Sequence, residues 1–169
     1  VPLPALRRHD PTNATFANLE RGPDEVLKYK VHHSDWVIHR HTVREHGRAL
    51  FGPPPATLID PISPADLRRA TAEVLRPRWG TAAAVAYLPA APPGGLSFIA
   101  LTRCRALYAL ERGEVVSKPV AAEWAMRTQH GRWQPLIERS LRWELTDEMK
   151  EEMIAFVRYV TTQKGLSAD

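Results

Sequence analysis

Residues 101–124, LTRCRALYALERGEVVSKPVAAEW, constrain the fold most, because they contain the signals for two helices and for the turn that joins them. The first half places apolar residues three and four positions apart, as on one buried face of a helix: Leu101, Cys104, Leu107 and Tyr108. Gly113 then supplies the residue that most readily takes a left-handed C-terminal cap. Ser117 is suited to cap a second helix that opens with Lys118 and Pro119. The segment predicts two helices joined by a short turn.

Two cations in this segment are placed unusually. Lys118 would lie at a helix N-terminus, where the helix dipole disfavours a cation by about 0.3–1 kcal/mol unless an anion offsets it. Arg105 flanks the apolar face instead of lying opposite to it. A helix N-terminus, a lysine and an arginine from the preceding helix would together suit a phosphate group. From the spacing alone, the simpler interpretation is a solvated lysine and an arginine whose stem covers apolar surface.

The composition fits one soluble domain with a core of its own. The chain has 169 residues, of which 44% are hydrophobic and 25% are charged. Many of its fifteen prolines lie near 53–55, 61–64 and 89–93, and they divide a helical chain into short elements. The sequence has no apolar run of about 18 residues that would predict a membrane span, and its start lacks the apolar region of a signal peptide. We therefore expect no membrane partner and a cytoplasmic location.

Apolar periodicity and capping residues predict four further helices. They cover residues 35 to about 46, 64 to about 75, about 132–145 and about 147–164. Ser34 or Asp35 would cap the first of these, and Gly47 would end it. Ser63 would cap the second, with Pro64 in its first turn. With the central pair, these segments predict an all-α helical bundle of about five to six helices with short loops.

The remaining segments are expected to be extended or irregular. Residues 1–10 carry two prolines and are predicted to be extended, while 26–31 (VLKYKV) alternates as a short strand does. Residues 11–24 are loop-like, and the prolines of 50–63 predict an irregular segment. Residues 80–95 are rich in Ala, Pro and Gly, and they predict a mobile loop with at most one helical turn.

Few residues form a pattern typical of catalysis or metal binding. Five of the seven histidines lie between His32 and His46, but the segment has no HExxH pattern and no second cluster of ligands. A solvated or hydrogen-bonded face is therefore a better interpretation than a metal site. The single cysteine, Cys104, lies on an apolar face, which favours a buried side chain. The chain contains no nucleophile motif, no P-loop and no D-x-D pair for Mg²⁺, so we predict no catalytic and no metal-binding residue.

The charge is compatible with an anionic ligand. The formal net charge is +4, but the arginines are scattered and no basic run carries interleaved aromatics. We therefore expect a phosphate or a nucleotide in preference to a nucleic acid. Asp35, beside Trp36, is a further candidate site residue, although its position at a helix start is fully explained by capping. The residues also leave open a non-enzymatic helical module that binds a protein or RNA partner.

Two stretches resemble a known family. SDWVIHRHTVREHGRALFGPPPATLIDPISPADL and LTRCRALYALERGEVVSKPVAAEWAM are similar to the C-terminal helical domain of aminoglycoside adenylyltransferases of the streptomycin/spectinomycin type. The similarity covers about residues 26–160. Its most specific part is the second stretch, in which the arginine and the aromatic of the first helix are followed in order by G, by S-K and by A-A-E-W. It implies that 26–169 is a C-terminal substrate- and nucleotide-binding domain. It also implies that 1–25 is the extended tail of an α/β nucleotidyltransferase domain or a linker.

The resemblance also implies roles for individual residues. In that family, an N-terminal nucleotidyltransferase domain holds Mg²⁺ on a D-x-D pair, and the helical domain helps to hold ATP and the antibiotic. Lys118 and Arg105 would face the ATP phosphates, and Asp35 would lie at the same site, paired with Arg105. Trp143 falls where the family has an aromatic near the nucleotide, and Trp79 matches a tryptophan of the drug pocket.

Two departures from the family pattern affect the expected activity. The family's catalytic motifs would lie upstream of residue 1, so we expect this chain to need an N-terminal nucleotidyltransferase domain to transfer AMP to a small-molecule acceptor. In addition, no Asp or Glu occurs from Val74 to Leu110. A polycationic acceptor would lose charge-assisted hydrogen bonds worth about 1.5–3 kcal/mol each, which argues against an aminoglycoside.

Overall fold

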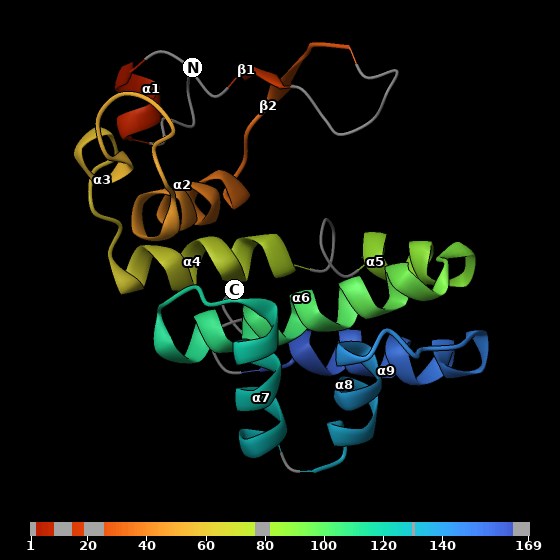
Figure 1. Cartoon of the computed structure of the whole chain (residues 1–169). Coiled ribbons are helices and arrows are strands. Elements are labelled where there is room, and N and C mark those ends of the chain that lie inside the picture. The colour runs from red at the N-terminus through yellow and green to blue at the C-terminus, as the bar shows by residue number, and fades with distance from the viewer. Residues whose placement is uncertain (1–2, 9–14, 19–25, 77–81, 130, 164–169) are drawn as a thin grey trace.

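The computed structural model describes residues 3–8, 15–18, 26–76, 82–129 and 131–163. In chain order its elements are α1 (Leu3–Arg7), β1 (Thr15–Asn18), β2 (Lys28–Val31), α2 (Asp35–His46), α3 (Pro55–Leu58), α4 (Pro64–Leu75), α5 (Ala82–Tyr87), α6 (Pro93–Arg112), α7 (Lys118–Thr128), α8 (Gln134–Leu141) and α9 (Lys150–Thr161) (Figure 1). Six helices in the described ranges have eight or more residues. The predicted all-α bundle is confirmed. No described helix has the length and apolarity needed to cross a membrane.

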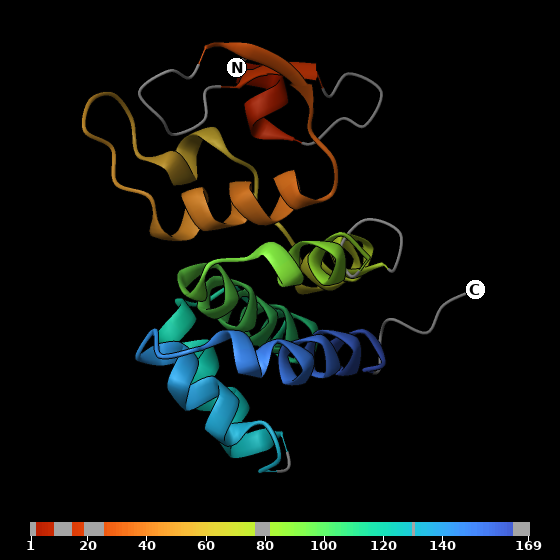
Figure 2. The same cartoon turned by 90° about the vertical axis from the view of Figure 1, so that its right-hand side faces the viewer.

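The long helix α6 lies at the centre of the bundle. It packs against α4, α7, α8 and α9, while α2 lies on the other side of α4 (Figures 1 and 2). The elements before α4 thus form a separate layer above the C-terminal helices (Figure 2). The core contains the faces predicted from apolar spacing, and its fully buried large side chains are Leu67, Leu75, Leu88, Leu96, Cys104, Leu136, Ile137, Leu145, Met153, Phe156, Val157 and Val160.

Helix α6 begins earlier than the apolar spacing indicated, and the predicted mobile loop is wrong. The helix starts at Pro93, and α5 and a 3₁₀ turn (Leu88–Ala90) occupy the alanine-rich segment before it. Proline is tolerated in a first helical turn, and alanine has the strongest helix propensity, so neither residue type forbids this structure. Gly95 is accommodated because it packs closely under Pro92 and the Tyr87 hydroxyl. Leu96, in the first turn of α6, is fully buried, and this packing outweighs the low helix propensity of the two glycines.

The N-terminal segment differs from its prediction. Residues 1–10 were expected to be extended, but the chain forms helix α1 there. The extended part lies instead in β1 and β2, which pair antiparallel in the register Thr15↔Val31. The strand expected within 26–31 is confirmed, whereas β1 falls in a segment expected to be a loop.

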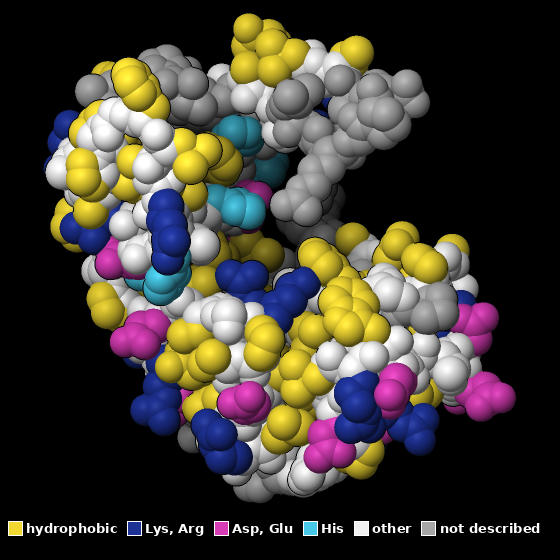
Figure 3. All heavy atoms as spheres, viewed as in Figure 1, with side chains coloured by type: hydrophobic (Ala, Val, Ile, Leu, Met, Phe, Trp, Pro, Cys, Tyr) yellow, Lys and Arg dark blue, Asp and Glu magenta, His cyan; other side chains and the backbone are white. Residues whose placement is uncertain are grey.

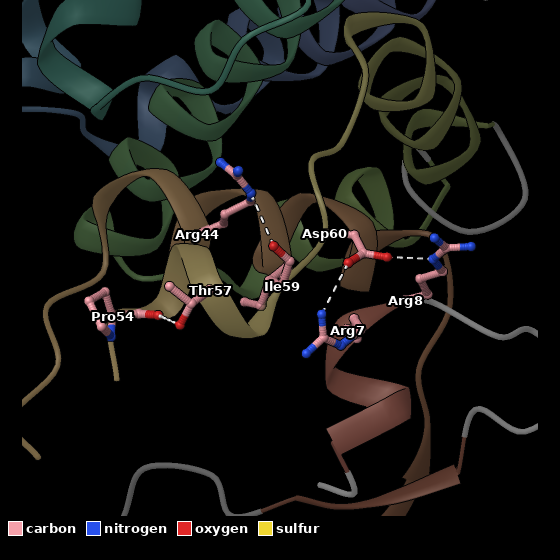
Figure 4. A network of polar contacts seen from close by, with 7 residues as sticks. All are labelled: Arg7, Arg8, Arg44, Pro54, Thr57, Ile59 and Asp60. Carbon is pink, nitrogen blue, oxygen red and sulfur yellow. Dashed lines mark hydrogen bonds and ion pairs between the residues drawn. The ribbon is translucent and has the colours of Figure 1, made fainter. Parts of the chain in front are cut away.

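An arginine-rich contact holds α1 against the turn before α4 (Figure 4). Arg7 and Arg8 form ion pairs with Asp60, and the hydrogen bond from Arg8 holds the pKa of that carboxyl below its ordinary value. Arg44 Nε of α2 donates to the Ile59 carbonyl at 3.1 Å. The segment around these residues is therefore not wholly irregular, and it contains the short helix α3 because Pro55 is well suited to a first helical position.

The helix caps follow the sequence in one case and not in the other. The Asp66 amide donates to Ser63 Oγ at 3.1 Å, so the predicted cap of α4 is confirmed. Helix α2 has the predicted bounds, but Ser34 makes no side-chain cap. Its hydroxyl instead donates to the Glu73 carboxylate of α4. A contact that only tertiary structure creates has replaced the local cap.

We predict that Gly113→Ala destabilises the fold by about 3 kcal/mol. Gly113 has φ +69°, and an added Cβ would lie 2.6 Å from Pro64 Cβ. The left-handed backbone costs an L-residue about 1 kcal/mol, and the clash adds roughly 2 kcal/mol. Urea unfolding measures the change. Gly52→Ala is the matched control, because Gly52 has φ +84° with open space around it, so it should cost only about 1 kcal/mol. Equal losses of stability at the two positions would exclude a steric contribution to the cost of Gly113→Ala.

We predict that Cys104 makes stability fall at alkaline pH. Burial raises the pKa of its thiol from 9.0 to about 12, so the folded state holds the proton more tightly than the unfolded state. The contribution is constant below pH 9 and is lost progressively as the pH rises from 9 toward 12, by up to about 1.4 kcal/mol per pH unit. Urea unfolding at pH 8, 9.5 and 10.5 should show a steeper fall for the wild type than for Cys104→Ala. Parallel curves would contradict the assignment.

Candidate anion site between helices α6 and α7

The structure brings Arg105 and Lys118 together. Arg105 lies on α6, and Lys118 is the first residue of α7, on the far side of the turn closed by Gly113. Both side chains are half-buried. Burial holds the pKa of Lys118 below its ordinary value, and the positive charge of Arg105 lowers that pKa further. Burial also lowers the pKa of the Arg105 guanidinium. The two cations therefore share one partly desolvated region.

No carboxylate of the described residues neutralises this pair. Within the described residues, neither Arg105 nor Lys118 takes part in an ion pair or a hydrogen bond, and neither pKa is raised by an acidic group. Helix α6 has no acidic residue before Glu111. The position of Ser117 as N-cap of α7 is confirmed, but its hydroxyl makes no cap hydrogen bond. Half-buried, unneutralised cations beside a helix N-terminus are an arrangement that favours an anion.

An aromatic ring contacts the lysine. Lys118 Nζ lies 3.5 Å from the centroid of the Phe98 ring. Phe98 precedes Arg105 by two helical turns on α6, and 55% of its surface is exposed although it lies on the central helix. Phe98 was not among the site residues predicted from the sequence. Its spacing of seven residues from Arg105 was the available signal, since that spacing places two side chains on one helix face.

A hollow opens between the N-terminal layer and the C-terminal helices (Figure 3). Lys and Arg side chains gather at its floor, hydrophobic side chains continue the floor, and histidines stand on the opposite wall (Figure 3). His46 Nε2 lies 3.2 Å from the Val115 carbonyl, so the end of α2 is attached to the turn that leads into Lys118. This contact fixes the C-terminal end of α2 relative to the turn between α6 and α7.

Asp35 does not pair with Arg105 as the resemblance implied. The Asp35 carboxylate is exposed on the first turn of α2, and it lies 3.9 Å from His39 Nε2 in the same helix. No ion pair joins Asp35 to Arg105 in the structure. Asp35 and His39 lie four residues apart on α2, a spacing that places the two side chains on one helix face.

Trp143 lies at the other end of α6. It is the only non-glycine residue of the described ranges with positive φ, at 59°, and its ring is exposed. A Cβ added at Gly94 would lie 3.8 Å from this ring, so Trp143 packs at the start of α6. Eleven residues separate Gly94 from Arg105, or about 16 Å along the helix. Trp79 lies outside the described residues.

A second cavity, of about 760 Å³, is lined by residues of α1, α2, α4 and the turn before α4. Most of its charged groups are paired: Arg7 and Arg8 pair with Asp60, and Arg69 pairs with Asp66. We interpret this cavity as a structural feature of the packing between these elements and not as a binding site. In the described part of the chain, no three His, Cys, Asp or Glu side chains are grouped so that they could hold a metal ion.

The fold and the cation pair define an all-helical domain with a candidate anion site. The aminoglycoside adenylyltransferase C-terminal domain family matches residues 57–163, a range that contains both Arg105 and Lys118. The chain belongs to this family, which confirms the resemblance found in the sequence.

Three curated relatives, from Klebsiella pneumoniae, Shigella flexneri and Escherichia coli, are each named aminoglycoside (3'') (9) adenylyltransferase. Each is 32% identical to the chain over 125 or 126 residues, which is 69% of this chain and 44% of the relative. The chain thus spans less than half the length of the curated relatives it matches.

We predict that Arg105→Gln raises the pKa of Lys118, because the substitution removes a neighbouring positive charge. The pKa should stay below the ordinary value, since burial is the larger cause of its shift. The pH titration of the lysine signals in protein labelled with [¹³Cε]lysine measures the change. Arg112→Gln is the control, because Arg112 lies on the same helix and does not shift Lys118. Identical Lys118 titrations in Arg105→Gln and wild type would show that the two charges do not interact.

Proposed function

We propose that this chain is the helical part of an adenylyltransferase and that Arg105 and Lys118 bind the phosphates of ATP. The observation that carries the proposal is the unneutralised pair of half-buried cations at the N-terminus of α7. Membership of the family and the names of the relatives support the reaction class. The particular nucleotide and the acceptor are part of the proposal.

The chemistry gives the two cations a defined task. In adenylyl transfer, an acceptor hydroxyl attacks the α-phosphorus of ATP, the bond to the β-phosphate oxygen breaks, and pyrophosphate leaves. The proton of the hydroxyl passes to a base. Negative charge on the leaving group increases during this step, so cations placed at the β- and γ-phosphates stabilise the transition state. Arg105 offers a planar fork of donors, whereas Lys118 offers a compact charge.

The catalytic base and the metal ligands would come from a different part of the protein. We propose that an N-terminal nucleotidyltransferase domain supplies the base and the carboxylates that hold Mg²⁺. The metal supplies charge neutralisation on the triphosphate when bound. In this arrangement the hollow of Figure 3 faces the nucleotide and the acceptor. The reaction would take place in the cytoplasm, where ATP is available.

The aromatic and acidic residues predicted for the site take secondary roles. Trp143 and Trp79 would contact the nucleotide or the acceptor, and Asp35 would face them from α2. The role of Asp35 has the least structural support of the three, because its carboxylate lies beside His39. Helix α6 contributes no carboxylate before Glu111, so an acceptor of low positive charge fits it better than a polycation.

We predict that Lys118→Ala weakens Mg·ATP binding to the full-length protein by about 10- to 100-fold, the effect of losing one charge-assisted hydrogen bond. Isothermal titration calorimetry at pH 7.5 measures it. Arg105→Ala should have a similar effect. Arg127→Ala is the matched control, because it removes one exposed positive charge from α7 and should leave the affinity unchanged. Unchanged affinity in both Lys118→Ala and Arg105→Ala would remove the nucleotide role.

A further inference from the structure

The position of Lys118 requires an explanation beyond its proposed ligand. Its ammonium is disfavoured by the dipole at the start of α7, by the charge of Arg105 and by partial burial. A lysine has a long flexible stem, and it could avoid all three by turning toward water. No carboxylate of the described residues holds it in place. An attractive contact of another kind must therefore offset these costs.

The Phe98 ring is the group that the ammonium contacts. A cation at 3.5 Å from the ring centroid is well within the range in which the negative face of an aromatic ring attracts it. That attraction grows when the cation is desolvated, as Lys118 partly is. Phe98 is itself held on a rigid support, since α6 is buried against four other helices. The ring thus provides a fixed position for a mobile cation.

We propose that Phe98 is a positioning residue that holds the Lys118 ammonium next to Arg105 before any ligand binds. An aromatic ring suits this role better than a carboxylate, because it attracts the cation without neutralising its charge. A carboxylate would have to be displaced by an incoming phosphate, whereas the ring leaves the charge available. The positioning follows from the geometry alone, while its use in phosphate binding rests on the proposed function.

The contact can be tested in the free protein by NMR. The chain contains five lysines, so a [¹³Cε]lysine-labelled sample gives few signals, and Lys118→Arg identifies the one from Lys118. Protons above a ring face are shifted upfield, so the Lys118 ε-CH₂ signal should lie upfield of the other lysines and show restricted motion. Phe98→Leu should move it to the position of an exposed lysine, and Phe98→Tyr should leave it in place.

Tyr87→Leu is the matched control. Tyr87 is also a half-exposed aromatic that packs near the start of α6, but no cation contacts its ring in the described part of the structure. This variant should leave the Lys118 signal unchanged. A Lys118 signal that shows no upfield shift in the wild type, or one that Phe98→Leu does not move, would overturn the proposal.

A second titration separates the positioning from the proposed nucleotide role. Inorganic tripolyphosphate added to the same samples should shift the Lys118 signal, and its affinity should fall about threefold in Phe98→Leu but not in Phe98→Tyr. Equal affinities in Phe98→Leu and wild type would overturn the role of Phe98 in binding. A wild type that does not respond to tripolyphosphate contradicts the proposed function alone, and the ring-current result still decides whether Phe98 positions Lys118.

Discussion

The absence of a side chain at Gly113 is the constraint on which the rest of the structure depends. Its left-handed backbone ends α6, and the lack of a Cβ lets Pro64 and Arg68 of α4 approach the turn. Arg68 then donates to the Leu110 and Glu111 carbonyls at 3.1 and 3.2 Å, which satisfies the free end of α6. One turn thereby joins three helices and brings the start of α7 beside α6. The position of the lysine at that start follows from this backbone geometry.

The electrostatics of the site depend on the absence of a carboxylate partner for its two cations among the described residues. Several arginines of the described structure lie beside carboxylates, as Arg8 does with Asp60 and Arg142 with Glu144. The pair on α6 and α7 is half-buried and has no such partner in the part of the chain that the structure describes. Burying charges without compensation is unfavourable, so a fold keeps such a pair at a cost in stability. That cost is consistent with binding, since an anion would restore the neutral balance.

Local signals in the sequence predicted the parts of this fold that local physics decides. The apolar spacing around Cys104, the glycine after α6 and the Ser63 cap each act within a few residues, and the structure confirms them. The early start of α6 and the side-chain contact of Ser34 depend on residues distant in the chain, so no local pattern could reveal them. The same holds for the site. Spacing identified two cations near one turn, but only the three-dimensional packing placed a ring against one of them.

The dependence of the site on α6 makes core packing and ligand affinity hard to separate. Arg105 and Phe98 are carried by the helix whose other face, through Leu101 and Cys104, is fully buried. A one-residue rotation of α6, about 100°, would move both site residues away from α7 and expose the buried face. The apolar face therefore fixes the direction in which the cation and the ring point. Substitutions in the core that shift α6 without unfolding the protein should then change anion affinity with no contact to the ligand, because packed interiors transmit strain.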